Sequence, residues 1–87
     1  MKMQQDVKQF LAQEIKKIGL LPVDVSVNSY DEDFLVSGMI DSFGFISLIT
    51  SAEAQFSIEI TEDAQLDDRI RSINGFAEMI CEILLAE

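Results

Sequence analysis

The chain has 87 residues, of which 48% are hydrophobic, with four glycines and one proline; this size and composition indicate one folded domain, residues 1–87, whose interior is too small for a deep catalytic cleft. Sixteen acidic against six basic residues give a formal net charge of −10, which disfavours binding to nucleic acid or anionic lipid and favours basic protein surfaces. We therefore expect a monomeric protein that binds other proteins and no nucleic acid.

The first predicted element is an amphipathic helix over residues 3–18. Its apolar residues recur at helical spacing on one face: Val7, Leu11, Ile15 and Ile18, with Phe10 beside them. Gly19 and Pro22 are typical of residues that follow a helix. The first ten residues are polar and no apolar run reaches membrane-spanning length, so we expect no signal peptide, no membrane insertion and a cytoplasmic protein.

Residues 20–41 are predicted to form a long loop. Val23, Val25 and Val27 alternate with polar residues as in a strand, but no second strand is predicted to pair with them. We therefore expect an extended segment that is anchored by its apolar side chains, which are Tyr30, Phe34, Leu35, Met39 and Ile40. A connection of this length is often functional.

Three consecutive acids in this loop, Asp31, Glu32 and Asp33, are expected to be solvated. Their spacing resembles the start of an EF-hand calcium loop, but Leu35 and Val36 stand where that loop needs an oxygen ligand and a glycine. The chain also has no histidine that could bind a metal. We predict no metal site.

The second predicted helix spans residues 42–56. Asp41 is a favourable N-cap, and Ser42 falls in the first turn. A broad apolar face follows at helical spacing, made of Phe45, Ile46, Leu48, Ile49, Ala52 and Phe56. After the helix, Ile58 and Ile60 alternate with polar residues and are expected to point inward.

Two further helices complete the chain. Thr61 is expected to cap a short helix that runs to about Ile70, and Ser72 to cap a final helix over 73–85. The final helix carries an apolar stripe of Ile73, Phe76 or Ala77, Ile80 and Leu84, with Cys81 as a core or edge thiol. The lone cysteine can form no disulfide within the chain, which fits a reducing compartment. The predicted fold is a small all-α bundle of three main helices and one short helix, with a long loop after the first.

The candidate functional segment is Gly38-Met39-Ile40-Asp41-Ser42-Phe43, where the long loop meets the second helix. Ser42 has no histidine to activate it, so it is a poor nucleophile for catalysis. The first turn of a helix is, however, a favourable place for a phosphate, because its N–H groups are unpaired and its dipole attracts anions. An Asp-Ser pair taken alone is more often only a helix cap.

The surroundings of Ser42 resemble the acyl carrier protein superfamily. Gly38, Asp41, Ser42 and apolar Phe43 match its Gly-x-x-Asp-Ser-apolar attachment motif, and the later positions match through Glu53, Phe56, Ile58 and Ile60. The resemblance implies that Ser42 carries 4'-phosphopantetheine, transferred from coenzyme A by a phosphopantetheinyl transferase. It implies a non-catalytic carrier, with Asp41 as motif residue and cap, whose arm holds acyl or aminoacyl groups as thioesters.

The implied partners are the transferase, an acyl- or aminoacyl-loading ligase, and acyl-transferring or elongating enzymes with basic docking surfaces. The candidate contact residues for these partners are Met39, Phe43, Glu53, Asp67 and Asp68. Phe45 is assigned to the core by its spacing, although its closeness to Ser42 would also let it line the path of the arm.

The second helix departs from that of fatty-acid carriers, which is rich in acids. Phe43 and Gly44 follow Ser42, Ser47 stands where an acid is common, and Glu53 is the only acid before Phe56. The sequence of residues 34–44 is similar to the corresponding segment of D-alanyl carrier proteins and other stand-alone carriers. This similarity implies that the protein serves a dedicated pathway rather than bulk fatty-acid synthesis. The alternative from composition is an unmodified acidic helical protein-interaction module.

Overall fold

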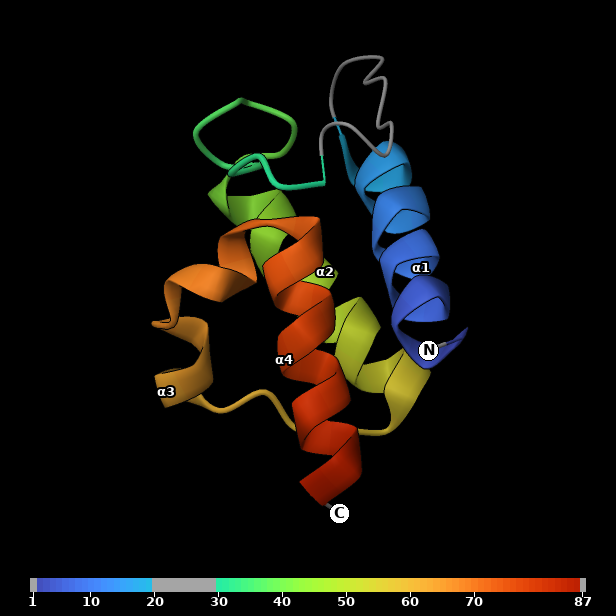
Figure 1. Ribbon diagram of the computed structural model, residues 1–87. Coiled ribbons are helices and arrows are strands. Elements are labelled where there is room, and N and C mark those ends of the chain that lie inside the picture. The colour runs from blue at the N-terminus through green and yellow to red at the C-terminus, as the bar shows by residue number, and fades with distance from the viewer. Residues whose placement is uncertain (1, 20–29, 87) are drawn as a thin grey trace.

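The computed structural model of the chain describes residues 2–19 and 30–86, and in these ranges the regular structure is entirely helical (Figure 1). Its elements are α1 (Lys2–Ile18), α2 (Ser42–Phe56), α3 (Glu62–Gln65), the 3₁₀ helix η2 (Asp68–Arg71) and α4 (Ile73–Ala86). The predicted all-α class and the three main helices are confirmed. The alternation of Val23, Val25 and Val27 lies outside the described residues. No helix in the described ranges is long and apolar enough to span a bilayer.

The long helices are arranged around α1, which packs against both α2 and α4, while η2 packs on α4 (Figure 1). Each long helix turns one apolar stripe inward, as its sequence period predicts. The α1 stripe is buried at Val7, Leu11 and Ile15 and half-buried at Ile18, which is the predicted face. Gly19 ends the helix with its N–H bonded to the Ile15 carbonyl at 2.9 Å.

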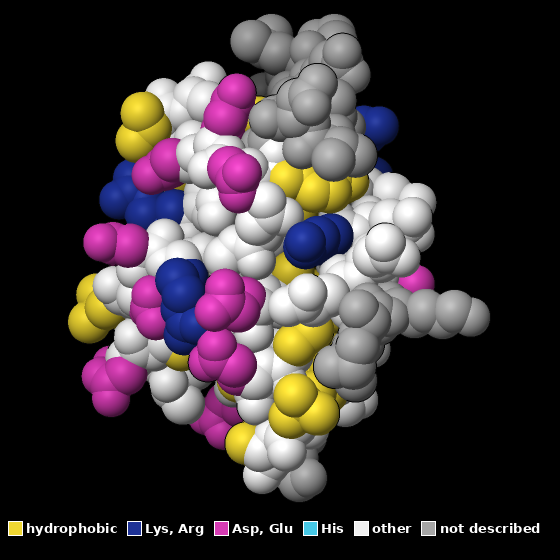
Figure 2. Space-filling view, viewed as in Figure 1, with side chains coloured by type: hydrophobic (Ala, Val, Ile, Leu, Met, Phe, Trp, Pro, Cys, Tyr) yellow, Lys and Arg dark blue, Asp and Glu magenta, His cyan; other side chains and the backbone are white. Residues whose placement is uncertain are grey.

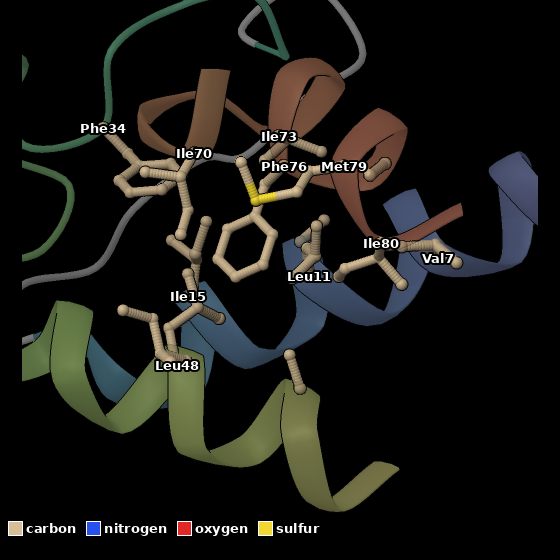
Figure 3. Packing of buried hydrophobic residues seen from close by; sticks show 14 of the residues in the cluster. Val7, Leu11, Ile15, Phe34, Leu48, Ile70, Ile73, Phe76, Met79 and Ile80 are labelled. Carbon is tan, nitrogen blue, oxygen red and sulfur yellow. The ribbon is translucent and has the colours of Figure 1, made fainter. Parts of the chain in front are cut away.

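The core forms where side chains of α1, α2, α4 and the loop meet (Figure 3). Its largest fully buried side chains are Phe34, Phe76, Leu11, Ile15, Leu48, Ile70, Ile73, Ile80 and Val7. Burying one such side chain contributes roughly 1.5–3 kcal/mol, so this cluster is the main source of stability. Cys81 lies in the same cluster, as predicted, and burial raises the pKa of its thiol.

The described part of the long loop, residues 30–41, is anchored by the predicted apolar residues. Phe34, Met39 and Ile40 are buried, and Tyr30 and Leu35 are half-buried against the core. Backbone bonds tie the same segment to the end of the chain. The Phe34 N–H donates to the Arg71 carbonyl at 2.9 Å, and the Asn74 N–H donates to the Tyr30 carbonyl at 3.0 Å.

Asp33 departs from the solvated state expected for the acidic run. Its Oδ1 accepts hydrogen bonds from the N–H groups of Leu35 and Val36, at 2.9 and 3.0 Å. Its Oδ2 lies 2.9 Å from Nε of Arg71, which brings the loop against η2. Asp31 and Glu32 are exposed, as expected, although Asp31 also accepts a hydrogen bond from the Asn74 side chain. Asp33 is therefore only partly solvated, because two neighbouring backbone N–H groups and the distant Arg71 bind its carboxylate.

The predicted helix from Thr61 to about Ile70 is instead divided into α3 and η2. Thr61 caps α3 as expected, since its Oγ1 accepts from the Ala64 N–H at 3.2 Å. The helix stops because Asp67 adopts an extended backbone and caps η2, with its Oδ1 accepting from the Arg69 N–H at 3.0 Å. Asp competes for backbone N–H groups in this way and so favours caps over helix interiors. Ser72 caps α4 as predicted, through the Gly75 N–H at 3.1 Å.

Candidate functional site

The approach to α2 begins with a turn at Gly38. The residue has φ of +81°, in the left-handed region, and its N–H donates to the Leu35 carbonyl at 3.3 Å. A Cβ added there would meet no atom within 4 Å. Glycine is therefore required for the backbone conformation and not for space, because other residues pay a steric cost at positive φ.

Met39 and Ile40, the two residues between Gly38 and Asp41, attach this turn to the core. Their exposed fractions are 9% and 4%, and the Ile40 N–H donates to the Phe34 carbonyl at 3.3 Å. With these two side chains pointing inward, the chain emerges from the core at Asp41 and Ser42, which are both exposed. The anchoring therefore decides where Ser42 reaches the surface.

Asp41 is the N-cap of α2, as predicted. Its Oδ1 accepts from the Gly44 N–H at 2.7 Å, and its carbonyl accepts from the Phe45 N–H at 2.9 Å. The N–H groups of Ser42 and Phe43, at the first two helical positions, have no acceptor within the helix. The start of α2 thus presents donors and the positive end of the helix dipole beside the Ser42 hydroxyl.

Gly44 packs the first turn of α2 against the end of α1. A Cβ on Gly44 would lie 2.8 Å from Cγ2 of Ile18 and 3.3 Å from Oδ1 of Asp41. Gly44 itself is buried. Its role is to let two helices approach closely at the level of Ser42.

A family model described as a phosphopantetheine attachment site matches residues 9–80. The chain belongs to this family, the acyl carrier protein superfamily. The match includes Gly38, Asp41 and Ser42, whose geometry is given above. No curated protein and no solved structure matches the chain. Members of the family carry a covalently attached 4'-phosphopantetheine group.

The start of α2 fits the phosphate end of this prosthetic group. Ser42 is exposed and stands at the positive end of the helix dipole, which favours a phosphodiester on its Oγ. The carboxylate of the neighbouring Asp41 is already bonded to the Gly44 N–H. Phe43, the next residue, is also on the surface, with an exposed fraction of 79%.

Two of the predicted contact residues for partners flank Ser42 in different ways. Phe43 lies on the surface, whereas Met39 is buried and offers little area to a partner. Phe45 is half-buried, with its ring centroid 5.8 Å from that of Phe34. Its ring therefore packs toward the loop and the core, which confirms the assignment made from its spacing.

The other predicted contact residues differ in the groups that their carboxylates bind. Glu53 is half-buried near the end of α2, and its Oε2 accepts from the Ile60 N–H at 2.8 Å. Asp67 caps η2 and pairs with Arg69, which lowers the pKa of its carboxyl, chiefly through the Arg69 N–H. Asp68 is exposed. Of these three acids, Asp68 is the one whose side chain takes the least part in hydrogen bonds and ion pairs among the described residues.

Arg69 forms a charge cluster that sequence reasoning missed. Its guanidinium lies 3.2 Å from Asp67, 3.1 Å from Glu78 and 2.6 Å from Glu82, and Figure 2 shows acidic side chains on both sides of a basic one on the α4 face. The hydrogen bond to Glu82 raises the pKa of Arg69 and lowers that of Glu82. The cluster joins η2 to α4. The spacing of Glu78 and Glu82, one helical turn apart, was the signal available in the sequence.

Proposed function

We propose that the chain is a carrier protein that holds acyl or aminoacyl groups as thioesters on a 4'-phosphopantetheine arm attached to Ser42, and that it catalyses no reaction itself. The observation that carries this proposal is the exposed position of Ser42 at the capped start of α2, within a chain that belongs to the carrier family. The bound group supplies a thiol at the end of a flexible arm, and the protein supplies the attachment point.

The chain's own residues have positioning roles in this proposal. Gly38 turns the loop, Met39 and Ile40 hold it on the core, and Asp41 caps the helix that presents Ser42. The sequence contains no histidine, and the Asp41 carboxylate is engaged by the Gly44 N–H. The proton of the Ser42 hydroxyl would therefore be taken by a group of the transferase when the phosphodiester forms.

A dedicated pathway is supported by the character of α2. Its only acid, Glu53, is bonded to the Ile60 N–H. The helix therefore offers no free carboxylate to an enzyme that recognises its carrier through acidic side chains on this helix. The proposed partners are the transferase, a ligase that loads the cargo, and enzymes that transfer or elongate it. Basic surfaces on these partners would be attracted by exposed acids elsewhere, such as Asp68. We place the protein in the cytoplasm as a monomeric single domain.

The test is co-expression with a phosphopantetheinyl transferase of broad specificity, followed by intact-mass measurement. Wild type should gain the mass of one phosphopantetheine group, and Ser42→Ala should gain none. Ser42→Ala should also melt close to wild type, because Asp41 remains as the cap. Modification of the Ser42→Ala protein would overturn the site, and an unmodified wild type would favour a plain protein-interaction module.

A further inference from the structure

Arg71, the last residue of η2, contacts the loop that leads to Ser42 through both its backbone and its side chain. Its carbonyl accepts a hydrogen bond from the Phe34 N–H at 2.9 Å. Its Nε lies 2.9 Å from Oδ2 of Asp33, in an ion pair whose two side chains are 42% and 33% exposed. The Nε atom is shielded from solvent and meets the carboxylate outside hydrogen-bond geometry, so the contact between the two side chains is mainly electrostatic.

The backbone contact leads from η2 to the start of α2 in two hydrogen bonds. Phe34 donates its N–H to the Arg71 carbonyl, and its own carbonyl accepts from the Ile40 N–H at 3.3 Å. Ile40 directly precedes Asp41, the cap of the helix that begins at Ser42. A shift of the loop at Phe34 is therefore passed on to the attachment residue.

The side-chain contact leads to the same place through the turn at Gly38. Oδ1 of Asp33 accepts from the N–H groups of Leu35 and Val36, at 2.9 and 3.0 Å. The Leu35 carbonyl in turn accepts from the Gly38 N–H at 3.3 Å. One oxygen of the Asp33 carboxylate thus organises the turn, while the other faces Arg71. The ion pair therefore fixes how the turn sits on η2.

Transfer of the arm requires the Ser42 Oγ to be held in line with the bond that breaks in coenzyme A, and a small misplacement slows such a reaction. We propose that Arg71 is a positioning residue for the modification of Ser42: its pair with Asp33 holds the attachment loop, and with it the start of α2, in the orientation on which the transferase acts. The proposal rests on the proposed function. It gives η2 a role in arm transfer without any contact between Arg71 and coenzyme A.

Two single replacements remove the ion pair from opposite sides. Arg71→Gln removes the guanidinium and keeps a polar side chain. Asp33→Asn removes the negative charge but keeps an oxygen that can accept from the same two N–H groups of the turn. The two replacements change the net charge in opposite directions, so a general electrostatic effect on the encounter with the transferase would change the rate in opposite directions. Loss of the pair should lower the rate in both.

Two further variants separate positioning from stability. Arg71→Lys restores a cation that can face Asp33 and is the conservative rescue. Ile80→Val lowers stability by opening a small cavity in the core, because Ile80 is fully buried. Figure 3 shows Ile80 beside Val7, at the other end of the core from Phe34. An ion pair between partly exposed groups adds little to stability, so all variants are expected to be folded, as circular dichroism can verify.

The measurement is the steady-state rate of arm transfer from coenzyme A to the purified full chain, with magnesium and one transferase that modifies the wild type. Arg71→Gln and Asp33→Asn should each lower kcat about fivefold, with KM nearly unchanged because the docking surface is intact. The double variant should also lose about fivefold, rather than the roughly 25-fold expected of independent effects. Arg71→Lys and Ile80→Val should stay within about 1.5-fold of wild type.

Three results would overturn the positioning role while leaving the carrier function intact. The first is a wild-type kcat in folded Arg71→Gln or Asp33→Asn. The second is a multiplied loss in the double variant, which would mean that the two residues act separately. The third is an equal loss in Ile80→Val, which would mean that stability alone sets the rate. If Arg71→Gln did not fold, Asp33→Asn would provide the same test. Failure of the wild type to be modified by any transferase would overturn the proposed function as well.

Discussion

At the scale of single residues, Gly38 and Gly44 are needed on either side of Ser42 for different physical reasons. Gly38 has a positive φ and open space around it, so its backbone conformation excludes other residues. Gly44 has an ordinary helical backbone, but its missing Cβ makes room for Ile18 of α1. The first glycine therefore shapes the turn before Ser42, and the second sets the contact between the two helices beside it.

Replacing Gly44 with aspartate should destabilise the protein rather than create a docking acid. The Cβ would lie 2.8 Å from Ile18 Cγ2, and the new carboxylate would be placed close to that of Asp41. Overpacking of this kind costs about 1–3 kcal/mol, which urea denaturation can measure. Thr50→Asp, at an exposed position of α2, is the control and should change stability by less than about 0.5 kcal/mol. Equal stability of Gly44→Asp and wild type would show that α1 does not pack here.

At the scale of elements, two side chains hold the shorter segments onto the long helices. Glu53 closes the end of α2 by accepting the Ile60 N–H, and so holds a segment whose Ile58 and Ile60 are buried. Arg69 joins η2 to α4 through Glu78 and Glu82. α3 itself buries no residue, so these two contacts act together with the buried side chains of Ile58, Ile60 and Ile70 to hold the chain between α2 and α4.

Glu53→Ala should lower the free energy of unfolding by about 1–3 kcal/mol, because it leaves the Ile60 N–H without its acceptor. The charge-matched control is Glu59→Ala, at an exposed position in the same segment, which should cost less than about 0.5 kcal/mol. Chemical denaturation of the three proteins compares the two effects. If Glu53→Ala were as stable as Glu59→Ala, a role in partner contact would become the better explanation for Glu53.

The Arg69 cluster should make stability depend on pH in the acid range. The Arg69 N–H, followed by the Arg69 guanidinium, lowers the pKa of Asp67 below its ordinary value of 3.8, and the guanidinium lowers that of Glu82 below 4.5, so the side chain acts chiefly on Glu82. A carboxyl with a lowered folded pKa stabilises the fold above its ordinary pKa, and this contribution is lost as the pH falls through the folded value. The stability difference between wild type and Arg69→Gln should therefore be largest above about pH 5 and shrink toward about pH 3.

Melting curves across this pH range provide the measurement. Lys16→Gln, at an exposed position of α1, removes the same unit of charge without touching the cluster. It should show no comparable change with pH between about 3 and 5 relative to wild type. A difference between wild type and Arg69→Gln that stayed constant with pH would mean that Arg69 acts through packing alone.

At the scale of the whole molecule, charge is distributed unevenly over one common core. The first 18 residues contain four of the six bases, and the rest of the chain contains fourteen of the sixteen acids. Attraction between α1 and the remainder favours folding, but the many acids repel one another in the compact state. Because acids outnumber bases by ten, we expect repulsion to be the larger of the two effects.

Added salt should therefore raise the melting temperature. The Debye length falls from about 30 Å at 0.01 M salt to about 8 Å at 0.15 M, which screens repulsion between distant acids more than contacts such as Arg69 with Glu82. Differential scanning calorimetry at the two salt concentrations is the measurement. A melting temperature that stayed flat or fell would show that the attraction of α1 outweighs the repulsion among the acids.

The sequence by itself determined the features that depend on neighbours in the chain. The helical period assigned the buried stripes of α1 and α4, including Leu11 and Ile80, because one face of a helix repeats every 3.6 residues. Asp41, Thr61 and Ser72 were identified as caps because a cap acts on an N–H two or three residues later. The Gly-x-x-Asp-Ser segment indicated the family for the same reason, since its spacing is short and local.

The tertiary structure alone decided the features that depend on which surfaces meet. The space beside Gly44 is taken by Ile18, and Asp33 is paired with Arg71, from parts of the chain that are distant in sequence. The exposure of Ile46 likewise followed from which side of α2 faced the core. A periodic pattern marks a broad apolar face but not its limits, because these limits are set by the area that the neighbouring helices cover.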